Sequence, residues 1–144
     1  MDTGNPPDSA PISRIRLLIV DGDPQMRAAL RTGLEPRFEV TEASTAEEAL
    51  FLVGQRWFSV ILADYELIDQ NGAWFLERVG ETLPLARRVL MSNRGVPNVA
   101  GLRDAGIFDL FMAKPVTAEV FSAYFKTSAD MEQAANLARK RKWS

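Results

Sequence analysis

Four near-continuous apolar runs, each ending at a polar residue and followed by a turn and a helical pattern, constrain the fold of this chain more than any other feature. The runs cover residues 15–20, 58–63, 89–91 and 107–113. The polar residues that follow them are Asp21, Asp64, Ser92 and Lys114. Runs of this kind are typical of strands covered on both faces, so we expect central strands of a parallel sheet. The carboxyl ends of such strands meet at one edge, which would gather two acids, a hydroxyl and an ammonium group.

A fifth extended segment, residues 38–42, alternates apolar with polar side chains and indicates an edge strand with one wet face. Helix start signals lie between the strands. Asp23 precedes Pro24 as an N-cap, Thr45 to Glu48 can form a capping box, and Thr117 is a further cap. The pattern predicts five strands in strict alternation with five helices. In a doubly wound sheet, Asp21 and Asp64 would line the crevice at the switch point.

The length and composition narrow the chemistry. With 144 residues the chain has the length of one domain that buries its own core. It contains no Cys and no His, which excludes disulfides, thiolate chemistry and an imidazole acting as base, ligand or phosphate carrier. Hydrophobic residues make up 47% and charged residues 25%, a balance typical of soluble globular proteins. The absence of Cys fits the cytoplasm, so we expect a cytoplasmic protein.

Both ends differ in composition from the rest of the chain. Residues 1–13 hold Pro6, Pro7 and Pro11 and lack the pattern of a signal peptide, so we expect a disordered arm. Residues 127–144 have a helix-friendly composition and end in four basic residues at 139–142, which predicts a basic helical extension.

The charge argues against some partners. Without the four basic residues at 139–142, the remaining 13 basic and 19 acidic side chains leave a net charge of −6. A domain with this net negative charge repels polyanions, so we expect it not to bind nucleic acid. No stretch is apolar for long enough to span a bilayer, and we expect no membrane partner.

The chain resembles the receiver domain of bacterial two-component response regulators over about residues 14–126. The resemblance rests on the segments LLIVDGDP at 17–24, VILAD at 60–64, NG at 71–72, VLMS at 89–92 and KP at 114–115. It implies a (βα)5 α/β fold with a five-stranded parallel sheet of order 2-1-3-4-5 and helices on both faces. It also implies a signalling domain and not an enzyme, with self-phosphorylation and self-dephosphorylation as its only catalytic activities.

The resemblance implies a phosphoryl-transfer site. Asp64 matches the carboxylate that takes a phosphoryl group from a histidine kinase or phosphotransfer protein and forms an acyl phosphate. Asp21, Asp64 and the backbone carbonyl of Glu66 match the ligands of Mg²⁺, and Lys114 matches the lysine that helps neutralise the transferred charge.

The resemblance also implies a switch. Ser92 matches the hydroxyl residue that bonds a phosphoryl oxygen, and Phe111 matches the aromatic residue that moves inward with it. The alternatives are that Phe111 is a plain core residue, or that Leu110 or Phe108 is the neighbour of the aromatic slot. The family implies a partner face, or a homodimer face, on the fourth helix, fifth strand and fifth helix.

The main departure from the family pattern is Gly22, which stands where the second metal-binding acid is expected. Loss of a carboxylate should weaken Mg²⁺ binding, because hard cations depend on charged oxygens. Asp23 could replace it, but a helix N-cap uses its carboxylate on first-turn amides. Gly22, Asp23 and Arg94 form the expected rim. Glu66 and Arg94 either pair and partly shutter the pocket or are two unrelated surface charges.

Two other functions compete with a phosphorylated receiver. Because of Gly22, the chain could be a degenerate receiver that docks a protein independently of phosphate. Residues 21–23 also match the acid-x-acid signature of haloacid dehalogenase-like phosphatases, with Ser92 and Lys114 binding the phosphoryl group. That enzyme interpretation leaves Asp64 without a role, and Pro24 replaces the glycine usual in that family.

Overall fold

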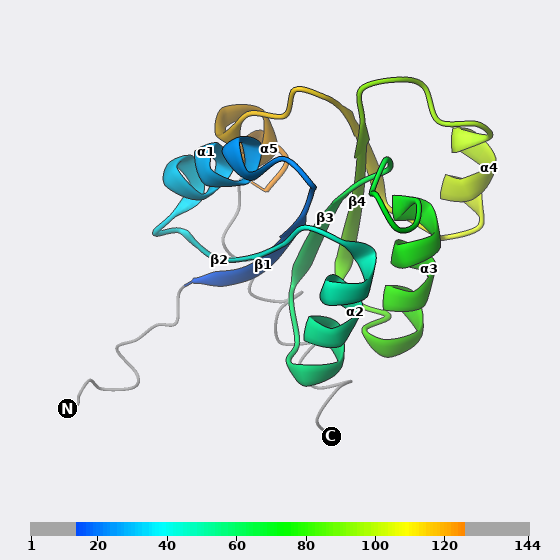
Figure 1. The fold of residues 1–144 in the computed structure, drawn as a ribbon, viewed down its shortest axis with the longest axis horizontal. Helices are drawn as coiled ribbons and strands as arrows, with labels where there is room; N and C mark the ends of the chain where they lie inside the picture. Colours follow the sequence, from blue (N-terminus) through cyan, green and yellow to red (C-terminus); the bar gives the residue numbers. More distant parts are fainter. Residues whose placement is uncertain (1–13, 126–144) are drawn as a thin grey trace.

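The computed structural model describes residues 14–125, which form five strands and five helices in alternation (Figure 1). The strands are β1 (Ile15–Val20), β2 (Phe38–Ala43), β3 (Val60–Asp64), β4 (Arg87–Ser92) and β5 (Leu110–Ala113). The helices are α1 (Pro24–Leu34), α2 (Ala46–Gln55), α3 (Gly72–Thr82), α4 (Val99–Asp104) and α5 (Ala118–Ala123). All strand pairs are parallel and the sheet order is β2-β1-β3-β4-β5. The predicted (βα)5 fold and strand order are confirmed.

The helices cover both faces of the sheet (Figure 1). On one face, α2, α3 and α4 pack with Leu18 and Val20 of β1 around a first core cluster. On the other face, α1 and α5 pack with Leu17 and Ile19 around a second cluster. Because successive side chains of a strand point to opposite faces, a strand between two helical layers must be apolar at every position. This explains the continuous runs in the sequence.

The two edge strands differ from each other. Phe38 and Val40 of β2 are buried while Glu39 and Thr41 are half-buried, which confirms the predicted edge strand. The prediction that residues 107–113 form a central strand was wrong, because β5 lies at the opposite edge and begins at Leu110. The side chains of β5 are apolar because helices cover both faces of the sheet there. An edge strand can be covered in this way although only one of its sides is hydrogen-bonded to another strand.

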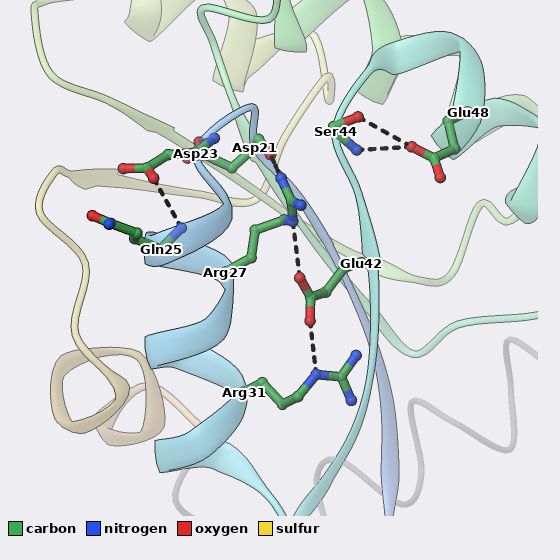
Figure 2. Close-up of polar contacts among 8 residues, drawn as sticks. All are labelled: Asp21, Asp23, Gln25, Arg27, Arg31, Glu42, Ser44 and Glu48. Atoms are coloured by element: carbon green, nitrogen blue, oxygen red, sulfur yellow. Dashed lines mark hydrogen bonds and ion pairs between the residues drawn. The ribbon is translucent and has the colours of Figure 1, made fainter.

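The N-caps settle where the helices begin. Three predicted caps are confirmed, each accepting a hydrogen bond from a first-turn amide: Asp23 from Gln25 at 3.0 Å, Thr45 from Glu48 at 3.1 Å and Thr117 from Val120 at 3.1 Å. The Glu48 carboxylate reaches back to the amide of Ser44 at 2.9 Å, one residue before the N-cap (Figure 2). Asn71 caps α3 by accepting from the amide of Trp74 at 2.8 Å.

Two expected segments lie outside the described residues, namely the arm at 1–13 and the extension at 127–144. Within residues 14–125, no helix combines the length and the hydropathy that crossing a membrane requires.

Candidate functional site

The polar residues that end the apolar runs lie at the carboxyl edge of the sheet. Asp64 and Ser92 are the last residues of β3 and β4, while Asp21 and Lys114 directly follow β1 and β5. Backbone bonds continue the sheet into these turns: the amide of Lys114 donates to the Ser92 carbonyl at 2.9 Å. The parallel register therefore brings four residues from distant parts of the sequence to one edge.

Lys114 joins the two acids. Its Nζ lies 2.9 Å from Oδ2 of Asp21 and 3.1 Å from Oδ2 of Asp64. The side chains are 10%, 2% and 7% exposed for Lys114, Asp21 and Asp64, so the contact is nearly dry. A buried ammonium between two carboxylates leaves one net negative charge, at a place where desolvation strengthens every electrostatic interaction.

Backbone amides hold the other carboxylate oxygens. The amide of Asp23 donates to Oδ1 of Asp21 at 2.8 Å, and the amide of Glu66 donates to Oδ1 of Asp64 at 3.1 Å. Each carboxylate thus receives one bond from Lys114 and one from the turn that follows its own strand. This arrangement fixes the orientation of both acids.

The protonation equilibria of Asp64 and Lys114 are shifted in the same direction. Burial raises the pKa of the Asp64 carboxyl, and the bonds from Glu66 and Lys114 offset this only in part, while the charge of Asp21 raises the pKa further. Burial acts to lower the pKa of Lys114, but its bonds to Asp21 and Asp64 outweigh burial and raise it. The raised pKa of Lys114 and the raised pKa of Asp64 are consistent with each other. Lys114 faces two carboxylates, whereas Asp64 shares one ammonium group with Asp21.

Replacement of Asp64 by Asn is expected to stabilise the fold at neutral pH. A pKa that is higher in the folded than in the unfolded chain means that stability is fully present below the unfolded value of 3.8 and is lost as the pH rises through the folded value. The neutral amide of Asp64→Asn would avoid this loss, with a gain on the order of 1 kcal/mol. Urea unfolding should show the gain at neutral pH and a smaller difference from wild type near pH 4. A variant less stable than wild type at neutral pH would contradict the argument.

Ser92 is almost fully buried at the same edge of the sheet, at the end of the strand next to β3. Its Oγ accepts a hydrogen bond from the amide of Arg94 at 3.2 Å. Accepting this bond leaves the hydroxyl hydrogen available for donation. The rim residues Glu66 and Arg94 are both exposed, and none of the ion pairs among residues 14–125 joins them. Of the two alternatives for Glu66 and Arg94, the structure therefore favours two separate surface charges over an ion pair across the pocket.

The three candidates for the aromatic position differ in burial and in the face of the sheet on which they pack. Phe111 is half-buried, pairs with Leu90 in the register of β4 and packs against the first core cluster. Phe108 is fully inside that cluster, with its ring 6.5 Å from the Phe111 ring, whereas Leu110 packs on the opposite face of the sheet. Of these three residues, Phe111 combines partial exposure with a place on the α4 side.

An arginine that sequence reasoning missed supports the site from α1. Nη1 of Arg27 donates to the backbone carbonyl of Asp21 at 2.6 Å, and its Nε donates to Glu42 at 2.9 Å. Glu42 also accepts from Nε of Arg31 at 2.7 Å, so one carboxylate of β2 holds two arginines of α1 (Figure 2). The only signal in the sequence was the spacing of Arg27 and Arg31 on one helix face.

The acids present meet the needs of Mg²⁺ in part. Mg²⁺ usually takes one or two carboxylates and keeps several waters, and Asp21 and Asp64 can supply two. The Asp23 carboxylate accepts from the Gln25 amide as an N-cap, and no three acids of residues 14–125 gather closely enough to hold a metal ion. At Gly22 the nearest atom to an added Cβ, outside the adjacent residues, would be the Ser44 carbonyl oxygen at 4.0 Å, so the space beside Asp21 is open. Asp21 and Asp64 could thus supply two charged ligands for Mg²⁺, one fewer than the resemblance implies.

Comparison with known proteins gives consistent results. A sequence model of the response regulator receiver domain matches residues 17–126. The hydrogenase transcriptional regulatory protein HoxA of Cupriavidus necator is 34% identical over 101 residues, which cover 69% of this chain and 21% of that protein. The match thus spans about a fifth of the length of this relative.

Solved structures show the same fold. A CheY-like response regulator receiver domain protein from Methanospirillum hungatei has a TM-score of 0.75 at 24% identity, covering 84% of this chain and 98% of that one. A response regulator from Burkholderia pseudomallei, whose crystal structure holds a phosphorylated aspartic acid, a calcium ion and citrate, has a TM-score of 0.71 at 27% identity, covering 85% of this chain and 72% of that one.

Proposed function

The chain belongs to the response regulator receiver domain family, and from this premise we propose that Asp64 accepts a phosphoryl group and that its modification switches a partner-binding face. The observation that carries the proposal is the buried contact of Lys114 with both Asp21 and Asp64 at the carboxyl edge of the sheet. Such an arrangement orients one carboxylate and holds a cation where the charge of a phosphoryl group would arrive.

The proposed reaction is a displacement at phosphorus. A carboxylate oxygen of Asp64 attacks the phosphorus of a phosphohistidine, and a new P–O bond forms as the P–N bond breaks. The electron pair of the broken bond stays on the imidazole nitrogen of the donor. With acetyl phosphate as donor, the broken bond is P–O and acetate leaves.

The residues around Asp64 divide the work. The Lys114 ammonium neutralises charge on the transferred group, and the Ser92 hydroxyl donates to one phosphoryl oxygen once Asp64 is modified. The amide of Glu66 and the charge of Lys114 keep the Asp64 carboxylate oriented before transfer. Asp21, Asp64 and the Glu66 backbone carbonyl would hold Mg²⁺, which would supply further charge neutralisation, and the lack of a carboxylate at Gly22 would weaken its binding.

The output is a shift between two packings of the α4 and β5 region, biased by the bond between Ser92 and the phosphoryl group. Phe111 would follow Ser92 from its half-buried position toward the core. The face available to a partner, or to a second copy of the chain, includes Val120 and Tyr124 of α5 and its C-cap, which are 48% and 58% exposed. A histidine kinase or phosphotransfer protein is the proposed donor.

A degenerate receiver that docks a partner without phosphate is the second candidate. It is favoured by Gly22, which leaves the site with one carboxylate fewer for Mg²⁺ than the family pattern has. The phosphatase alternative has little support, because the Asp23 carboxylate that would serve as its general acid caps α1.

One experiment separates the two candidates. The chain is incubated with acetyl phosphate and Mg²⁺, and its intact mass is followed with time. We expect a gain of one phosphoryl group, and beryllofluoride with Mg²⁺ should shift the NMR signals of Ser92, Phe111 and α4. No mass gain and no shift at millimolar Mg²⁺ would reject phosphorylation and favour the docking module.

A further inference from the structure

The loop between β3 and α3 is tied to a helix that it does not join in sequence. Asp69, in this loop, accepts hydrogen bonds from the amides of Ala46 at 3.0 Å and Glu47 at 2.9 Å. These amides are the first two of α2 and lie more than 20 residues earlier in the chain. A carboxylate at this place satisfies two donors that a helix leaves free at its start.

Asp69 and Thr45 divide the capping of α2. Thr45 accepts from the amide of Glu48 at 3.1 Å and lies next to the helix in sequence. Asp69 takes the two earlier amides from across the fold. Removal of either residue weakens the start of α2, but removal of Asp69 also releases the loop.

The same loop carries the groups that orient the phosphoryl acceptor. At the start of the loop, the Glu66 amide donates a hydrogen bond to Oδ1 of Asp64. At its end, the Gly72 amide donates to the Tyr65 carbonyl at 2.8 Å. A Cβ at Gly72 would lie only 2.2 Å from the Asp64 carbonyl oxygen, so α3 begins in close contact with the acceptor strand. The middle of the loop projects into solvent, since Ile68 is 89% exposed. The hydrogen bonds from the two α2 amides to Asp69 therefore hold this part of the loop from outside β3 and α3.

We propose that Asp69 is a positioning residue that anchors the β3–α3 loop to α2 and thereby keeps the Glu66 amide on the Asp64 carboxylate. Its effect on phosphoryl transfer rests on the proposed function, whereas its effect on the loop does not. Burial acts to raise the pKa of Asp69, but the amides of Ala46 and Glu47 hold the pKa below its ordinary value, so the anchor stays charged at neutral pH.

The test compares Asp69→Ala with Thr45→Ala, a matched control that removes a cap of the same helix without touching the loop. Both variants should shift the urea midpoint by similar amounts. Hydrogen exchange of the Glu66 amide should accelerate in Asp69→Ala and stay near the wild-type rate in Thr45→Ala. Phosphorylation by acetyl phosphate should slow about tenfold in Asp69→Ala alone, because a small misplacement of a reacting group is costly.

The two readouts keep the outcomes distinct. Equal exchange rates of the Glu66 amide in the two variants would overturn the proposal, whatever the phosphorylation rates. If exchange accelerates as expected but the wild-type chain takes up no phosphoryl group, the proposed function fails and the anchor stands. An Asp69→Ala variant with a loosened loop and an unchanged phosphorylation rate would overturn the link between the anchor and the reaction.

Discussion

Asp64→Asn is expected to take up no phosphoryl group from acetyl phosphate under conditions in which the wild-type chain is modified to completion. An amide lacks the charged oxygen that attacks phosphorus, and no other acid of the site shares the position of Asp64. The amide side chain still accepts the hydrogen bond that the Glu66 amide now donates to Oδ1 of Asp64, so the turn after β3 keeps its geometry. Intact mass spectrometry measures the result directly.

A matched control shows that the loss belongs to this carboxylate. Asp109 accepts from the amide of Arg88 at 2.8 Å at the start of β4, the end of that strand opposite Ser92, and Asp109→Asn keeps an acceptor there. Asp109→Asn should be modified as fast as wild type. A phosphoryl group found on Asp64→Asn would place the acceptor elsewhere and would remove the basis of the proposed function.

Gly22→Asp is expected to strengthen Mg²⁺ binding by about tenfold or more, which is about 1.4 kcal/mol. The substitution adds a carboxylate next to Asp21, and the charge and number of carboxylates largely set the affinity for hard cations. The chain has room for it, because no atom beyond the adjacent residues lies closer than 4.0 Å to a Cβ at Gly22. Titration with Mg²⁺, followed by NMR shifts of the Asp21 and Asp64 turns, measures the change.

Gly22→Ala is the control for this prediction. It adds the Cβ without the charge, so any stiffening of the turn appears in both variants and any gain from the carboxylate appears only in Gly22→Asp. A faster reaction with acetyl phosphate should accompany the tighter binding. If Gly22→Asp and Gly22→Ala bind Mg²⁺ with the same affinity, the glycine is not what weakens the site.

Much of the fold followed from the sequence because its signals are local. The caps at Asp23, Thr45 and Thr117 were predictable since each side chain bonds an amide two or three residues away. The apolar runs were readable as strands because helices on both faces leave no polar position. The apolar run at 107–113 by itself wrongly indicated a central strand, since a run of covered residues does not say whether a second strand lies alongside; the strand order implied by the family resemblance placed it at the edge.

The candidate site was predictable only as a set of residues. Strand ends in a parallel sheet share an edge, so Asp21, Asp64, Ser92 and Lys114 were expected together from the sequence. The spacing of these residues in the sequence did not predict that Nζ of Lys114 would bridge the two acids, at 2.9 Å from Oδ2 of Asp21 and 3.1 Å from Oδ2 of Asp64. The sequence also did not decide whether Glu66 and Arg94, which carry opposite charges, would form an ion pair.

The amino-acid sequence by itself determined the order of strands and helices, the places where three helices begin and the types of side chain that end the strands, because propensity, periodicity and capping act over a few residues. Only the tertiary structure decided the partners of those side chains. Asp69 reaches the amides of α2, Arg27 reaches the Asp21 carbonyl and Lys114 reaches two carboxylates. Each of these contacts depends on how the packed layers set distances between separate elements, which no local pattern encodes.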